Sequence, residues 1–158
     1  MTRVMAYRGA GPSIMKRDES LRPLSREHHR ALVTARALQE SKSSVDLANR
    51  FLTFWREDGQ RHFRIEEEVL LPTWALHASV DRSAVSRMLE EHLAIRRSAL
   101  EIEAQGLSPE EAQQLGRLLE AHVRFEEREL FPLIEAALNE SALTRLALAI
   151  EEAETEEH

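Results

Sequence analysis

Two histidine–carboxylate motifs, at positions 62–72 and 122–132, are the residues of this chain best suited to metal chemistry. Both read His-x-Arg-x-Glu-Glu-x-x-Leu-x-Pro, and they are offset by 60 residues. In an α-helix, residues i and i+4 lie about 6 Å apart along the axis and on nearly the same face. Each motif therefore presents an imidazole and a carboxylate together, His62 with Glu66 and His122 with Glu126. Two such segments facing each other form a nitrogen–oxygen shell that suits iron, manganese or zinc.

A second repeat, Glu-His, adds one histidine to each half of the chain. Glu27-His28 and Glu91-His92 are offset by 64 residues, close to the offset of the longer motif. The sequence therefore resembles two similar helical hairpins, which can build a two-metal site bridged by one carboxylate from each hairpin. A single histidine on an apolar helix face is more often a hydrogen-bonded core residue than a ligand. Four of them, two with a carboxylate one turn later, favour metal binding because unpaired buried imidazoles and carboxylates are costly.

Four amphipathic helices are predicted to position these residues. Apolar residues recur at three- and four-residue spacing, and Pro23, Asp81 and Ser108 are helix-start signals. The expected ranges are about 24–41, 45–76, 82–105 and 109–138. Pro72 predicts a kink or a boundary near the end of the second helix. Because no strand pattern is present, the predicted fold class is all-α: an up-down-up-down four-helix bundle with an N-terminal arm and a short C-terminal fifth helix.

The chain divides into three expected regions. Residues 1–22 form an N-terminal arm with five Lys or Arg side chains, which either lies against the acidic body or a neighbouring subunit or is a weakly ordered terminus. Residues 23–139 form the four-helix bundle. Residues 140–158 form a short amphipathic helix and an acidic tail, which we expect to be solvated and frayed.

Composition excludes several classes of protein. The 158 residues carry a formal charge of −7, which argues against a nucleic-acid partner. The absence of cysteine excludes disulfides, Cys-ligated zinc, iron–sulfur clusters and thiol catalysis. No apolar run approaches the ~20 residues of a membrane span, and the N-terminus lacks the apolar core of a signal peptide. We therefore expect a soluble cytoplasmic protein with no membrane partner.

Other polar residues near the motifs have less specific patterns. His29 lies one step round the helix from His28, so it is either a boundary residue or an extra ligand or hydrogen-bond donor behind the ligands. Glu67 and Glu127 lie about 100° from the inner face and are predicted to face solvent or to pair with arginine. His77 and His158 are expected at the surface.

These residues resemble the hemerythrin-like, HHE cation-binding family over about residues 24–138. The resemblance depends on the ordered set of Glu-His, His-x-x-x-Glu, Glu-His and His-x-x-x-Glu in four helices. It implies a non-haem di-iron centre with two iron ions joined by an oxo or hydroxo bridge, with manganese or zinc as alternative metals. The implied terminal ligands are His28, His62, His92 and His122, and the implied bridging carboxylates are Glu66 and Glu126.

The sequence departs from the oxygen-carrying hemerythrins at two positions. Their third helix has His-x-x-x-His, whereas His92 is followed by Arg96 four residues later. Their fourth helix has His-x-x-x-x-Asp, whereas the carboxylate here is Glu126, one residue closer to His122. The missing imidazole leaves an additional iron position for water, His29 or another carboxylate, which argues against simple reversible O₂ carriage.

The first functional hypothesis is a di-iron protein that binds or senses O₂, NO or peroxide and passes the change to an unidentified protein partner. The second is an enzyme that turns over peroxide or reduces NO at the same centre. The third is iron buffering, and the fourth is a metal-free helical interaction module. The sequence leaves the physiological metal, the oligomeric state and the partner open.

Overall fold

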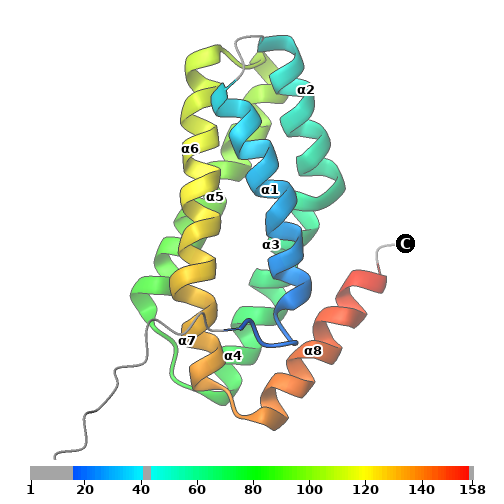
Figure 1. Ribbon diagram of the computed structural model, residues 1–158, viewed down its shortest axis with the longest axis vertical. Coiled ribbons are helices and arrows are strands. Elements are labelled where there is room, and N and C mark those ends of the chain that lie inside the picture. The colour runs from blue at the N-terminus through cyan, green and yellow to red at the C-terminus, as the bar shows by residue number, and fades with distance from the viewer. Residues whose placement is uncertain (1–15, 41–43, 157–158) are drawn as a thin grey trace, which may run out of the picture.

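The computed structural model describes residues 16–40 and 44–156, and all regular structure in these ranges is helical (Figure 1). The prediction of an all-α fold is therefore confirmed. The elements are α1 (Arg22–Glu40), α2 (Ser44–Phe54), η1 (Trp55–Gly59), α3 (Gln60–Ile65), η2 (Glu66–Leu70), α4 (Leu71–His77), α5 (Arg82–Gln105), α6 (Pro109–Phe125), η3 (Glu126–Leu130), α7 (Phe131–Ala137) and α8 (Glu140–Thr155), where η denotes a π-helical turn. The predicted helix boundaries differ from these by at most two residues.

Helix starts follow the capping signals in the sequence. The side chain of Asp81 accepts a hydrogen bond of 2.9 Å from the backbone N–H three residues later, at the start of α5. Ser108 and Glu111 form a reciprocal capping box at the start of α6, with bonds of 2.8 and 3.2 Å. Asn139 caps α8 in the same way as Asp81, at 2.9 Å. Each cap satisfies backbone N–H groups that have no partner inside the helix.

Both copies of the long motif end in a π-helical turn, η2 and η3. Proline has no N–H and its ring clashes with the carbonyl four residues earlier, so Pro72 and Pro132 disturb the α-helical ladder. The chain responds with i→i+5 bonds, from the N–H of Leu71 to the carbonyl of Glu66 and from the N–H of Phe131 to the carbonyl of Glu126. The kink or boundary expected at Pro72 is therefore a widened turn inside a continuous helical segment. Each π-turn begins at the motif's first glutamate, and such turns are frequent at functional sites.

Helices α1 and α6 lie side by side with their backbones in close approach (Figure 1). The contact depends on Gly116, where a Cβ atom would lie 2.7 Å from the carbonyl oxygen of Ala35 and 3.0 Å from the Cβ of Leu38. A backbone atom cannot move aside as a flexible side chain can. The absence of a side chain at Gly116 therefore sets the distance between two of the helices that carry motif histidines.

Two separate hydrophobic clusters form the core, and the motif residues lie between them. Along α1, Leu24 belongs to one cluster and Ala31 to the other, with His28 between them. Along α5, Met88 and Ile95 bracket the motif histidine in the same way. The helices thus form a polar layer within an apolar interior, which isolates that layer from water along the helix axes.

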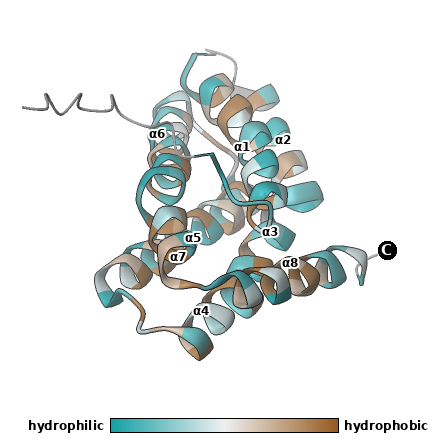
Figure 2. Ribbon diagram, turned by 60° about the horizontal axis from the view of Figure 1, so that its bottom comes forward, coloured by the Kyte–Doolittle hydropathy of each residue, from teal (hydrophilic) through white to brown (hydrophobic). Residues whose placement is uncertain are grey.

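Helix α8 packs against α3, η2 and α4 at one end of the molecule (Figures 1 and 2). Ala142, Leu146 and Ile150 are its buried residues. The helix continues through Glu154, so most of the segment expected to be a frayed acidic tail is helical. Residues 1–15 of the expected N-terminal arm lie outside the described residues. Across the ranges that are described, none of the helices combines the length and apolar character of a membrane span.

Candidate metal centre

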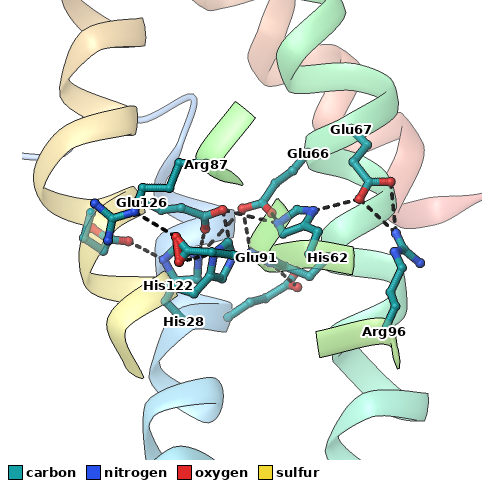
Figure 3. A network of polar contacts seen from close by, with 12 residues as sticks. His28, His62, Glu66, Glu67, Arg87, Glu91, Arg96, His122 and Glu126 are labelled. Carbon is teal, nitrogen blue, oxygen red and sulfur yellow. Dashed lines mark hydrogen bonds and ion pairs between the residues drawn. The ribbon is translucent and has the colours of Figure 1, made fainter. Parts of the chain in front are cut away.

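The structure brings all six residues proposed from the motifs into one buried region (Figure 3). The side chains come from α1, α3 with its π-turn, α5, and α6 with its π-turn. Glu66 and Glu126 are 0% exposed, and none of the four histidines exceeds 5%. Six residues separated by up to 98 positions therefore share a region with almost no contact with solvent.

The six residues form two groups that share both carboxylates. One group is His28, His62, Glu66 and Glu126; the other is His92, His122, Glu66 and Glu126. Within each group the potential ligand atoms all lie within 4.8 Å of one another. We call these groups the His28/His62 position and the His92/His122 position.

Each shared carboxylate directs one oxygen to each position. Oε1 of Glu66 lies 2.8 Å from Nε2 of His62, and its Oε2 lies 3.1 Å from Nε2 of His92. Oε2 of Glu126 lies 2.9 Å from Nε2 of His28, and its Oε1 lies 3.0 Å from Nε2 of His122. Two donor atoms that bind one ion at about 2.1 Å and at right angles are about 3.0 Å apart. The donor atoms in each group are thus spaced as metal ligands are, and both carboxylates are common to the two groups.

These short contacts do not have hydrogen-bond geometry. Among the described residues, all four oxygens of Glu66 and Glu126 lack a hydrogen-bond partner, as do Nε2 of His92 and both ring nitrogens of His122. Buried polar atoms are nearly always paired, and leaving them unpaired costs free energy. These clustered, unpaired donor atoms could be satisfied by metal ions where hydrogen bonds do not satisfy them.

A second set of glutamates lies near the Nδ1 atoms of the histidines, on the side of each ring away from the shared carboxylates. Nδ1 of His28 is 2.6 Å from Glu127, and Nδ1 of His92 is 2.7 Å from Glu67. These two contacts join the two hairpins, because each glutamate follows the shared carboxylate of the opposite hairpin. A carboxylate at Nδ1 fixes the ring orientation and leaves Nε2 free for a metal.

The other two histidines have carboxylate neighbours from their own hairpin. Nδ1 of His62 is 3.1 Å from Glu27, and Nδ1 of His122 is 3.9 Å from Glu91. Each of the four outer glutamates in turn contacts an arginine. The glutamate–arginine distances are 3.1 Å for Glu127–Arg17, 3.0 Å for Glu67–Arg96, 3.6 Å for Glu27–Arg61 and 3.0 Å for Glu91–Arg87. The two hairpins therefore repeat the same histidine–glutamate–arginine arrangement.

Comparison with known proteins agrees with this geometry. The family model of the hemerythrin HHE cation-binding domain matches residues 20–134. The chain belongs to the hemerythrin HHE cation-binding family. The resemblance noted in the sequence is thereby confirmed. No curated protein and no solved structure matches the chain significantly.

The carboxylates of this HHE domain control the protonation of its histidines in the metal-free state. Burial acts to lower the imidazole pKa values, but the surrounding carboxylates outweigh it and raise the pKa of His62 to about 9 and that of His92 to about 11. The pKa values of His28 and His122 are raised for the same reason. Burial and the charge of Glu126 act to raise the pKa of Glu66, but the histidines outweigh them and lower it to about 2. Metal uptake must therefore displace protons from the imidazoles.

Aromatic rings flank two histidines of the HHE centre. Phe63 stacks on His92 with ring centroids 3.7 Å apart, and Phe131 stacks on His28 at 5.3 Å. Next to the His28/His62 position lies a small cavity of about 10 Å³, and its apolar wall includes Ala31, Phe54, Gly59, Phe63, Leu119 and Val123. A volume of this size is about that of one water-sized sphere.

The structure decides between two alternatives for one histidine and extends the prediction for two glutamates. His29, a candidate extra ligand, is exposed and belongs to neither donor group. The prediction that Glu67 and Glu127 pair with arginine is confirmed, but their contacts with His92 and His28 were missed. The Glu-Glu doublet at the same place in both motifs was the available signal. His77 is exposed as predicted, and His158 lies outside the described residues.

Proposed function

We propose that this HHE domain binds two iron ions and uses them to bind or sense O₂, NO or peroxide. The observation that carries the proposal is that each carboxylate of Glu66 and Glu126 directs one oxygen to each of two histidine pairs. Mixed imidazole–carboxylate donors suit iron, with manganese or zinc as alternatives. Bound iron would supply reversible electron transfer and coordination positions for a small ligand.

The proposed roles of the residues follow from their contacts. His28 and His62 hold one ion, His92 and His122 hold the other, and the shared carboxylates hold the ions together. The outer glutamates keep Nδ1 of His28, His62 and His92 protonated, so that Nε2 of these rings stays a donor to metal. The two hydrophobic clusters exclude water from the ions and strengthen every charge interaction among these groups.

Two features support a small exogenous ligand. The protein offers each ion four donor atoms, two imidazole and two carboxylate, which leaves positions open on an ion that prefers six. Arg96, which stands where oxygen-carrying hemerythrins have a histidine, does not fill the gap, because it donates two bonds to Glu67 at 3.0 and 3.1 Å. The second feature is the cavity beside the His28/His62 position, which has a mostly apolar wall and room for about one water-sized sphere, and through which a small uncharged ligand would approach that ion.

The same open positions also favour a second candidate, a di-iron enzyme that turns over peroxide or reduces NO. Steady-state consumption of peroxide or NO by the iron-loaded protein distinguishes catalysis from binding. Iron buffering would instead require ready, reversible iron loss. The histidines here are buried, and each ring lies between a shared carboxylate and an outer glutamate.

The wider arrangement is part of the proposal. The helices form an up-down-up-down four-helix bundle over residues 23–139, preceded by an arm over residues 1–22 and followed by the helix and acidic tail of residues 140–158. The protein is cytoplasmic, binds neither nucleic acid nor membrane, and as a sensor passes its signal to a protein partner.

Metal analysis of the purified protein, combined with an optical titration from anaerobic to aerobic conditions, tests the proposal. We expect about two irons per chain and new charge-transfer absorption after exposure to air. Substitution of His62→Ala or His122→Ala lowers the iron content, whereas His29→Ala, a change at an exposed neighbouring histidine, leaves it unchanged. A protein that neither takes up Fe(II) nor gains stability from it would refute the proposal.

A further inference from the structure

His28 and His92 each contact an outer glutamate that is bound by an arginine. The two arginines come from different parts of the chain. His92 contacts Glu67, and Glu67 accepts bonds from Arg96. Arg96 is four residues after His92 in α5, so both side chains share one rigid helix face. The arginine behind this histidine is thus fixed by the same helix as the histidine itself.

On the other side, α1 has no arginine at the matching place, because the residue four positions after His28 is Leu32. Its role is taken by Arg17, which precedes α1. Arg17 donates to Glu127 twice, at 2.6 Å to the backbone carbonyl and at 3.1 Å to the carboxylate. The other carboxylate oxygen of Glu127 contacts Nδ1 of His28 at 2.6 Å.

The aromatic contacts repeat this correspondence. Arg96 lies over the ring of Phe63 at 5.7 Å, and Phe63 stacks on His92. Arg17 lies over the ring of Phe131 at 5.4 Å, and Phe131 stacks on His28. Each arginine therefore supports its histidine by two routes, one through a carboxylate and one through a phenyl ring.

Arg17 belongs to a short segment before α1, residues 17–21, which we call the strap. Arg17 and the N–H of Asp18 both donate to Oε1 of Glu135, at 2.7 and 3.1 Å. The side chain of Asp18 accepts two bonds from Ser20, at 2.6 and 2.9 Å. Leu21 is 0% exposed and belongs to one of the core clusters. Hydrogen bonds to Glu135 and the burial of Leu21 therefore hold the strap against the helices, although the strap lies outside the helices that carry the proposed ligands.

We propose that Arg17 is a positioning residue for one of the two metal positions: through Glu127 it holds His28, and it supports the His28/His62 position without affecting the His92/His122 position. Arg96 has the corresponding role for His92. This inference rests on the proposed two-metal function. It also identifies a route for regulation, because a partner that displaced the strap would alter one metal position and leave the other intact.

Iron release to a ferrous chelator under anaerobic conditions tests the assignment. Loss of an outer hydrogen-bond partner commonly weakens metal binding about 10- to 100-fold. In the Arg17→Ala variant we expect one of the two irons to leave about 10- to 100-fold faster than in the wild type, giving two phases of equal amplitude. Arg96→Ala should give the same pattern from the other position. The double variant should then release both irons fast, in a single phase.

The matched control is Arg97→Ala, which removes an exposed arginine whose ion pair among the described residues is with Glu101 on the same helix, at 2.9 Å. It should release iron as the wild type does. Release from Arg17→Ala at the wild-type rate would overturn the proposal. Equal acceleration of both irons would also overturn it, because it would indicate a general loosening of the fold.

A spectroscopic signature identifies the position directly. In the Co(II)-loaded protein the Nδ1 protons of the four histidines give paramagnetically shifted, solvent-exchangeable NMR signals. Arg17→Ala should change the signal of His28, which Glu127→Gln also changes, and should leave the signal of His92 in place. A change at His92 instead would contradict the assignment. A wild-type protein that binds fewer than two metal ions would refute the proposed function itself, whereas two ions with an unaffected Arg17→Ala variant would refute only this inference.

Discussion

The free energy of unfolding of the metal-free protein should fall as pH rises above neutrality. The affinity for metal should rise over the same pH range. His62 is buried, and its pKa rises from 6.5 to about 9 in the folded protein. A group with a raised pKa contributes stability that is fully present below 6.5 and is lost as pH rises through the folded value. The shift corresponds to about 3 kcal/mol from this residue alone. His92, with a pKa of about 11, adds to the effect at higher pH.

At acid pH the free energy of unfolding should change in the opposite direction and fall as pH falls. The pKa of Glu66 is lowered to about 2, so its contribution is present above 4.5 and is lost as pH falls toward 2. Together the two groups predict that the metal-free protein is most stable between about pH 4.5 and 6.5. The metal-loaded protein lacks the loss on the alkaline side, because its imidazoles bind metal and carry no proton on Nε2.

Urea unfolding at pH 6.5 and pH 9, with and without Mn(II) under anaerobic conditions, measures the effect. Mn(II) avoids the oxidation chemistry of iron. The stabilisation by metal should increase over this interval, by an amount on the order of the 3 kcal/mol from His62. His62→Gln, which cannot be protonated, should reduce the increase. Metal stabilisation that is constant or smaller at pH 9 would refute the assignment of the imidazoles as protonated in the metal-free state.

Three substitutions test other parts of the structure. Gly59→Ala would place a Cβ 2.6 Å from the ring of buried Trp55 and beside the small cavity, so it should slow NO binding, measured by stopped flow, while two irons remain bound. Gly116→Ala would place a Cβ 2.7 Å from a backbone oxygen of α1, so it should lower the free energy of unfolding by about 1–3 kcal/mol in urea titrations. Glu66→Ala removes a donor from both metal positions and should lower iron content well below that of Glu68→Ala, a change at an exposed neighbouring residue.

Each of these expectations has a result that contradicts it. Unchanged NO association in Gly59→Ala would show that the cavity is not on the ligand's path. Unchanged stability in Gly116→Ala would contradict the close approach of α1 and α6. Equal iron content in Glu66→Ala and Glu68→Ala would remove Glu66 from the set of donors.

The helices and the inner residues of the site were predictable because they depend on local periodicity. Apolar spacing and the capping residues Asp81 and Ser108 determine most helix limits. The i, i+4 relation of His62 and Glu66 follows from helix geometry alone. The duplication of the motif then indicated that the two halves meet, so the convergence of all six residues could be inferred without coordinates.

The outer contacts were not predictable, because they join residues that no local rule relates. Arg17 reaches Glu127 across 110 positions, and which of several arginines does so depends on the path of the chain before α1. The π-turns at Glu66 and Glu126 likewise depend on how each helix accommodates its proline while packing continues on both sides. For His29 the sequence left a boundary residue and an extra ligand as alternatives, and one step of rotation from His28 is enough to place the side chain in solvent.

In the metal-free protein, positive charge on the imidazoles lies where metal ions are proposed to bind. The pKa values of all four imidazoles are raised, to about 9 for His62 and about 11 for His92, so near neutral pH protons on these rings supply part of the positive charge that bound metal would supply. The shared carboxylates would therefore face positive charge with or without metal, and the outer carboxylates are balanced by arginine. If the centre holds two ferrous ions as proposed, their oxidation to the ferric state would add two positive charges. In a buried site such an excess is costly unless an anion enters with it. Under the proposed function, peroxide formed from O₂ would supply that charge, so oxidation of the centre should be accompanied by uptake of an anion.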